Sequence, residues 1–153
     1  MLDRLKKSNK GFTIIEVMIV LAIAGLILLI VLLAVPALQR NSRNTTVKND
    51  ATAFAAGFSE FISNNDGAAP ASISYAAPTV TIGAAGTSQS TVKVSANTTV
   101  NTAKATPSAF AAGQLWWNTG TSCSGTANPR AITVYYYVES SSPPATPKCV
   151  DAA

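Results

Sequence analysis

The sequence offers few side chains that could perform catalysis. It has no histidine and only two cysteines, so it lacks both zinc-type ligand spacing and a histidine-assisted nucleophile. Its carboxylates show no catalytic grouping, and no glycine-rich phosphate-binding loop is present. We therefore expect a chain that is not an enzyme, with no catalytic residues, no metal and no cofactor.

The two cysteines, Cys123 and Cys149, lie well separated near the end of the chain. In an exported protein such a pair most often forms one disulfide; two free buried thiols are the alternative. Closing a loop of roughly 26 residues stabilises a fold by about 3.5 kcal/mol on the chain-entropy estimate. The bond would tie the C-terminal tail across the preceding strand.

One carboxylate lies where a charge is costly. Residues 17–38 contain no charged side chain, and Glu16 directly precedes them. An acidic side chain at the centre of a membrane helix costs about 2.5–3.5 kcal/mol on insertion scales, so such residues usually have a partner. The alternative is an interfacial Glu16 that reaches water, because Lys10 is near in the sequence.

The apolar run has the length of a membrane span. As a helix it extends about 33 Å at ~1.5 Å per residue, enough for the ~30 Å hydrocarbon core of a bilayer. A removable secretory signal is the alternative, but its small-x-small site, Ala22-Ile23-Ala24, is followed by more apolar residues. Basic residues flank both ends, so the cysteine pair and the polar, Thr-rich C-terminal part favour an N-terminus inside.

The stretch "GFTIIEVMIVLAIAG" (residues 11–25) closely resembles the class III signal of type IV pilins and pilin-like proteins. The resemblance implies that a prepilin peptidase cuts between Gly11 and Phe12 and methylates the new amine of Phe12. Gly25 matches the glycine of the family's helix. Pro36 departs from the pattern, because the usual proline lies about one turn earlier.

Cleavage would give Glu16 a partner. The new ammonium group at Phe12 lies four residues before Glu16, one turn away on the same helix. Between staggered helices, the amine of one subunit can meet the carboxylate of its neighbour. Such a pair would offset desolvation and set the axial register of the helices. Glu16 is therefore interpreted as the assembly residue.

The rest of the chain is predicted to form a stem and a head. Apolar residues between Val47 and Ile62 recur with helical spacing, which predicts one helix from Phe12 to about Asn64 with a weak segment at residues 36–46. Strands are expected at residues 79–83, 90–96 and 131–139, the first two as a hairpin, with a fourth suggested near residues 115–118.

This pattern predicts an α+β, pilin-like fold: a long N-terminal helix, half transmembrane and half amphipathic, packed on a small antiparallel sheet. The expected organisation is a cleaved leader, a transmembrane assembly helix, an amphipathic stem and a β-rich head. These parts cover residues 1–11, 12–39, 40–66 and 67–153.

Two groups of residues invite other interpretations. The Trp116-Trp117 pair and residues 135–137, all tyrosines, could stack bases or sugars, but alternate rings are expected in the core and the others at subunit contacts. Basic residues at 40, 43 and 48 could bind nucleic acid, but their spacing is more typical of a solvated or interfacial face. Beyond residue 11 the seven basic and six acidic side chains nearly balance, so charge is weak support for such a partner.

The resemblance implies a structural role, with the chain as the major subunit of a type IV pilus-like filament serving tasks such as adhesion or twitching motility. Its partners would be further copies of itself, the peptidase and an inner-membrane assembly machinery. Before assembly it would be a single-pass membrane protein, and afterwards part of an extracellular pilus. The alternatives are a minor pilin or secretion-system pseudopilin, and a non-assembling membrane protein with an extracellular binding domain.

Overall fold

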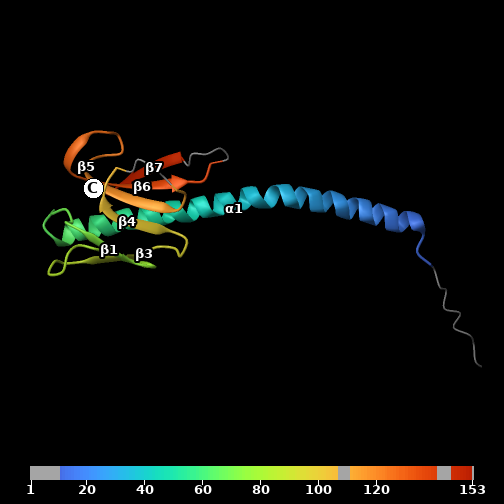
Figure 1. Ribbon diagram of the computed structural model, residues 1–153, viewed down its shortest axis with the longest axis horizontal. Coiled ribbons are helices and arrows are strands. Elements are labelled where there is room, and N and C mark those ends of the chain that lie inside the picture. Colours follow the sequence, from blue (N-terminus) through green and yellow to red (C-terminus); the bar gives the residue numbers. More distant parts are fainter. Residues whose placement is uncertain (1–10, 107–110, 141–145, 153) are drawn as a thin grey trace, which may run out of the picture. The chain divides into compact units, whose positions relative to one another are not determined.

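A computed structural model describes residues 11–106, 111–140 and 146–152 of the chain. The chain divides into two compact units, residues 1–39 and 40–153. One helix, α1 (Ile14–Asn64), is followed by seven strands (Figure 1). The strands are β1 (Ile73–Ala76), β2 (Thr79–Ile82), β3 (Ser90–Lys93), β4 (Thr99–Lys104), β5 (Gln114–Thr121), β6 (Ala127–Val138) and β7 (Thr146–Asp151). The predicted α+β, pilin-like class, a long helix packed on antiparallel sheets, is confirmed.

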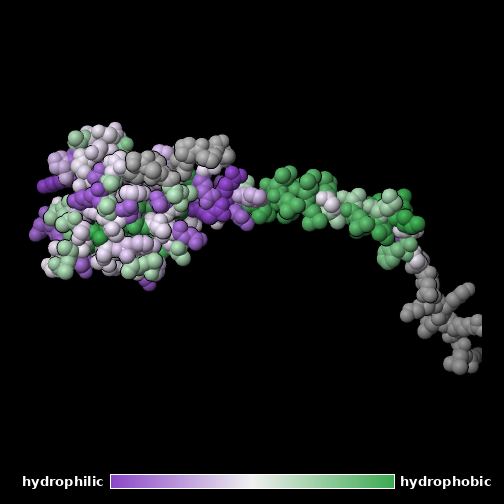
Figure 2. Space-filling model, viewed as in Figure 1, coloured by the Kyte–Doolittle hydropathy of each residue, from purple (hydrophilic) through white to green (hydrophobic). Residues whose placement is uncertain are grey.

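The first unit contains the apolar part of α1. Its large hydrophobic side chains are all exposed, from Phe12 to Leu38, and Figure 2 shows this part of the helix as mostly green. Within the described residues, α1 is the one helix that is long and apolar enough to cross a membrane. Leu, Ile and Val side chains exposed on every side of a helix suit hydrocarbon or neighbouring helices better than water.

The segment at residues 36–46, which was predicted to be a weak part of the helix, is helical throughout. The helix ends at Asn64 as expected, but it runs through Pro36 and the polar residues that follow without interruption. The Thr45 and Thr46 hydroxyls donate to carbonyl oxygens one turn earlier, at 2.9 Å and 3.1 Å, so these side chains do not compete with the helix. Hydrogen bonds from Arg43 and Asn44 to Glu139 also hold the second part of this segment, and tertiary contacts can override low helix propensity.

The second half of α1 supplies much of the core of the second unit. The buried stripe follows the predicted spacing and comprises Val47, Ala51, Phe54, Ala55, Phe58 and Phe61. The Phe58 ring stacks on Trp117 of β5, with 5.2 Å between centroids. The helical stripe and its role in the head are therefore confirmed.

The head contains two sheets where one antiparallel sheet of about four strands was expected. The first has the order β1-β2-β3 and is antiparallel, with β2 and β3 forming the predicted hairpin. The second has the order β4-β5-β6-β7, in which β4 and β5 are parallel and the other pairs are antiparallel. Both sheets pack against α1 (Figure 1).

Three strands were missed in the sequence: β1, β4 and β7. All three are edge strands of four to six residues, and their sequences (ISYA, TVNTAK and TPKCVD) carry few apolar residues in alternation. An edge strand is half solvated and draws its stability from the neighbouring strand, so its own sequence needs little β-propensity. The tail strand β7, for example, pairs with β6 over six residues.

Candidate functional site

The start of α1 holds the residues that the sequence singles out. Gly11 and Phe12 are exposed, Phe12 at 88%, and they precede the helix in extended or irregular backbone. A Cβ added at Gly11 would meet no atom within 4 Å. The peptide bond between Gly11 and Phe12 is therefore accessible in the described structure, as a protease substrate requires.

Thr13 and Glu16 form a capping box at this end. One carboxylate oxygen of Glu16, Oε2, accepts hydrogen bonds from the Thr13 N–H and from the Thr13 hydroxyl, each at 2.8 Å. The Thr13 Oγ1 atom in turn accepts the Glu16 N–H at 3.3 Å. These bonds satisfy two backbone donors that the first turn of a helix otherwise leaves unpaired.

The capping box gives Glu16 a local partner that our sequence analysis missed. The Thr-x-x-Glu spacing ahead of an apolar helix is the sequence signature of a capping box and could have predicted this contact. In the uncut chain the carboxylate is thus held by its own helix start. Its other oxygen, Oε1, has no hydrogen-bond partner among the described residues. The geometry leaves that oxygen free to accept a hydrogen bond from an ammonium group.

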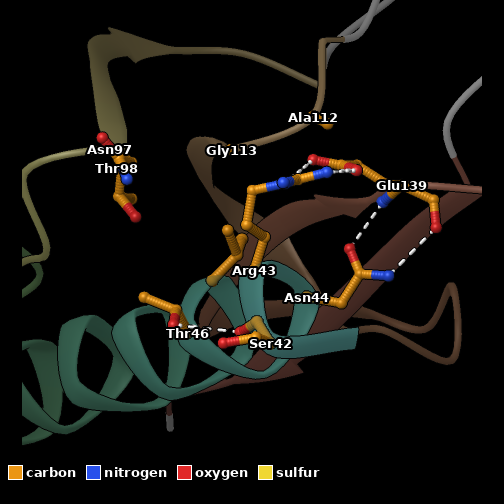
Figure 3. A pocket seen from close by; sticks show the side chains of 10 residues that line it. Ser42, Arg43, Asn44, Thr46, Asn97, Thr98, Ala112, Gly113 and Glu139 are labelled. Atoms are coloured by element: carbon orange, nitrogen blue, oxygen red, sulfur yellow. Dashed lines mark hydrogen bonds and ion pairs between the residues drawn. The ribbon is translucent and has the colours of Figure 1, made fainter. Parts of the chain in front are cut away.

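A second polar cluster joins α1 to the end of β6. Arg43 donates two parallel hydrogen bonds to the Glu139 carboxylate, from Nε at 2.6 Å and from Nη2 at 2.7 Å (Figure 3). The Asn44 side chain pairs with the backbone of Glu139. It donates to the Glu139 carbonyl at 3.0 Å and accepts the Glu139 N–H at 2.6 Å. We call these three residues the clamp.

The clamp neutralises the Glu139 carboxylate and also satisfies the backbone groups of Glu139. The Arg43 guanidinium, through its hydrogen bonds, holds the pKa of Glu139 below its ordinary value, and Glu139 raises the pKa of Arg43. The Asn44 amide occupies the position of a neighbouring strand, since it satisfies one backbone donor and one acceptor at the end of β6. The polar segment of α1 is thereby fixed to the sheet.

A cavity of about 210 Å³ lies beside the clamp (Figure 3). Its wall combines polar side chains, including those of Ser42, Thr46 and Asn97, with apolar and backbone groups such as those of Val47 and Gly113. Glu139 supplies the one carboxylate among the described residues that line the cavity, and it is paired with Arg43. Among the described residues there is also no group of three His, Cys, Asp or Glu side chains that could hold a metal.

Asp50 is a buried anchor about two turns further along α1 than Arg43. It is 8% exposed, and its carboxylate accepts hydrogen bonds from the Ser95 N–H, the Ser95 hydroxyl and the buried Thr98 hydroxyl. These bonds tie the turn between β3 and β4 to α1. Every polar atom of this buried carboxylate therefore has a partner, which gives Asp50 a structural role.

Cys123 and Cys149 form a disulfide, with their Cα atoms 5.9 Å apart. The bond links the turn after β5 to β7, next to the hydrogen bond that the Cys123 N–H donates to Asp151 Oδ1. The C-terminal tail is thus both cross-linked and paired with β6 as a strand.

The aromatic residues follow the predicted division only in part. Trp117 and Tyr136 are in the core, and Trp116 and Tyr135 are half-buried opposite each other on β5 and β6. Tyr137 departs from the alternation, because it lies on the same sheet face as Tyr135 yet is only 1% exposed. Burial raises the pKa of Tyr137 to about 12.

Comparison with known protein families identifies the N-terminal segment. Residues 6–32 match the prokaryotic N-terminal methylation motif, which covers the end of the expected leader, the Gly11-Phe12 bond, Glu16 and much of the apolar helix. No curated protein and no solved structure matches the chain. The motif and the helix-on-sheet architecture together support a protein of the type IV pilin or pseudopilin type.

Proposed function

We propose that this chain is a structural subunit, and the major one, of a type IV pilus-like filament. A prepilin peptidase cleaves it between Gly11 and Phe12 and methylates the Phe12 amine. The mature subunit rests in the membrane, N-terminus inside, until an inner-membrane machinery adds it to the growing fibre through α1. Its partners are other copies of itself, and its final location is extracellular.

The observation that carries this proposal is the combination of the methylation motif with an apolar helix that is exposed all round. A single-pass anchor needs only length and hydrophobicity. It needs neither a scissile glycine nor a carboxylate one turn inside the new N-terminus. A filament subunit needs both, because cleavage creates the ammonium group that the Glu16 carboxylate of a neighbour can bind.

Intact-mass measurement of the protein from its own cells tests the processing step. The mature chain should begin at N-methylated Phe12. Substituting Gly11 with leucine should block maturation, because a side chain would then occupy the residue before the scissile bond, whereas Asn9→Leu should be processed normally. A mature protein that retains Met1 or Leu2 would refute the proposal and favour the non-assembling membrane protein.

Electron microscopy of sheared surface filaments, with mass spectrometry of their subunits, tests assembly itself. Filaments that contain this chain are expected. A processed chain that never appears in a surface fibre would instead indicate a secretion-system pseudopilin.

A further inference from the structure

Among the described residues of the head, two exposed charged features have no oppositely charged partner. The first is the C-terminal end of α1, where Glu60 and Asp66 lie on either side of the last helical turn and are both exposed. We call this pair the acidic helix end. A helix C-terminus carries a partial negative charge and usually attracts cations. Here the last turn has no basic residue, and the two carboxylates add to the negative charge.

The second feature is a groove between α1 and strands β6 and β7, with a volume of about 370 Å³. Lys48 and Lys148 are the charged residues in its wall, and both are exposed. We call it the lysine groove. It is lined by Asn41, Asn44, Thr45, Lys48, Tyr136, Val138 and Lys148.

Neither lysine of the groove has a carboxylate partner in the described part of the chain, where the one ion pair joins Arg43 to Glu139. Two like charges in one groove repel each other, and an acidic ligand would relieve this repulsion. The Asn41 side-chain amide can donate a further hydrogen bond to the same ligand. The groove is therefore suited to bind carboxylates.

The two features cannot neutralise each other within one copy. Lys48 and Glu60 lie about 18 Å apart along the same helix, at ~1.5 Å per residue, far beyond the reach of an ion pair. Each copy thus presents a basic and an acidic surface at separate places. Contact between two different surfaces of identical subunits is heterologous, and when it does not close into a ring it generates a helical filament.

We propose that the lysine groove of one copy binds the acidic helix end of another copy. This inference rests on the proposed filament and assigns one of its head-to-head contacts. Lys48 and Lys148 of one subunit pair with Glu60 and Asp66 of its neighbour. The same contact repeats at each step along the fibre.

Charge reversal in the full-length chain, expressed in its own cells, tests the contact. Reversing the groove (Lys48→Glu with Lys148→Glu) or the acidic end (Glu60→Lys with Asp66→Lys) should lower the filament yield by about tenfold, because like charges then face each other. Combining all four changes in one chain should restore the yield, since each contact is again complementary. Lys93→Glu with Arg130→Glu changes the net charge as much as the groove variant does. It is the matched control for that variant and should assemble normally.

The amount of processed subunit in the membrane, measured by immunoblot, shows whether each variant folds. Loss of filaments at normal subunit levels, with rescue by the fourfold variant, supports the contact. Failure of that variant to rescue filaments at normal subunit levels would overturn it. Normal filaments from both double variants would also overturn it, and loss of DNA binding by the groove variant would then assign the lysines to nucleic acid. Absence of filaments in the wild type would refute the proposed function instead.

Discussion

At the scale of single residues, we expect Glu16 to have two uses that succeed each other. In the uncut chain one of its oxygens is held by the Thr13 N–H and hydroxyl, which completes the first turn of α1. A residue whose charge is already hydrogen-bonded can enter the membrane boundary at lower cost than an unpaired one. On the proposed function, its second oxygen would then bind the amine of a neighbouring subunit after cleavage.

This double use predicts a graded series of variants. Thr13→Val removes the hydroxyl bond but keeps the backbone N–H, and it costs about 1 kcal/mol of helix-cap stability. Filament yield should therefore fall partially in Thr13→Val and severely in Glu16→Ala, while Thr13→Ser stays close to the wild type. Membrane insertion, measured by fractionation, should be unchanged in all three. Wild-type filament yield from Glu16→Ala would show that the carboxylate is not needed for docking.

The ion pair of the clamp predicts a pH dependence of head stability. The pKa of Glu139 is lowered in the folded state, so the pair stabilises the head fully above the unfolded value of about 4.3. That contribution is lost as the pH falls through the lowered pKa of folded Glu139. Thermal unfolding of the full chain in detergent micelles, followed by tryptophan fluorescence, measures the effect.

Glu139→Gln should lower the melting temperature at pH 7 and match the wild type under strongly acidic conditions. Arg43→Gln removes the partner and should flatten the acid dependence in the same way. A difference between Glu139→Gln and the wild type that persists unchanged at the lowest pH would contradict this assignment.

At the scale of elements, the close approach of α1 to the first sheet depends on Gly57. A Cβ at this position would lie 2.3 Å from Val92 Cγ2 and 2.9 Å from Ile82 Cδ1. Such overpacking forces the hairpin of β2 and β3 away from the helix and typically costs about 1–3 kcal/mol. Gly57 is thus required for packing, because the hairpin fills the space that a side chain at this position would need.

Gly57→Ala should lower the free energy of unfolding by roughly that 1–3 kcal/mol, although alanine favours a helix by up to ~1 kcal/mol. Combining it with Val92→Ala should recover part of the loss, because the nearest methyl group is then absent. Denaturant unfolding in micelles gives both values. Gly25→Ala is the comparison, since a Cβ there meets nothing within 4 Å of the same chain.

At the scale of the whole molecule, the head is suited to repeated stacking. Its basic and acidic residues nearly balance, and its surface is rich in Ala, Ser and Thr. Near-neutral heads avoid the like-charge repulsion that a polymer of highly charged subunits would accumulate. We therefore expect this chain to be the most abundant pilin by a wide margin in sheared filaments, as quantified by mass spectrometry. A trace amount beside another pilin would identify it as a minor subunit.

The sequence by itself determined the parts of the molecule that depend on neighbouring residues. The apolar helix, the methylation motif and the buried stripe from Val47 to Phe61 are local patterns, and the structure or the family comparison confirms each. The hairpin of β2 and β3 was predictable for the same reason, because a short loop joins its strands. Cleavage at Gly11 and docking through Glu16 remain predictions.

Only the tertiary structure decided what depends on residues far apart in the chain. The pairing of Asn44 with Glu139, the parallel contact of β4 with β5, and the strand formed by the tail all require partners from distant segments. A prediction from helix propensity gave a weak segment near Asn44, because helix propensity takes no account of the hydrogen bonds that Asn44 makes at the end of β6. The physical reason is that a polar or edge segment draws its order from the surface it meets, and that surface exists only after the chain has folded.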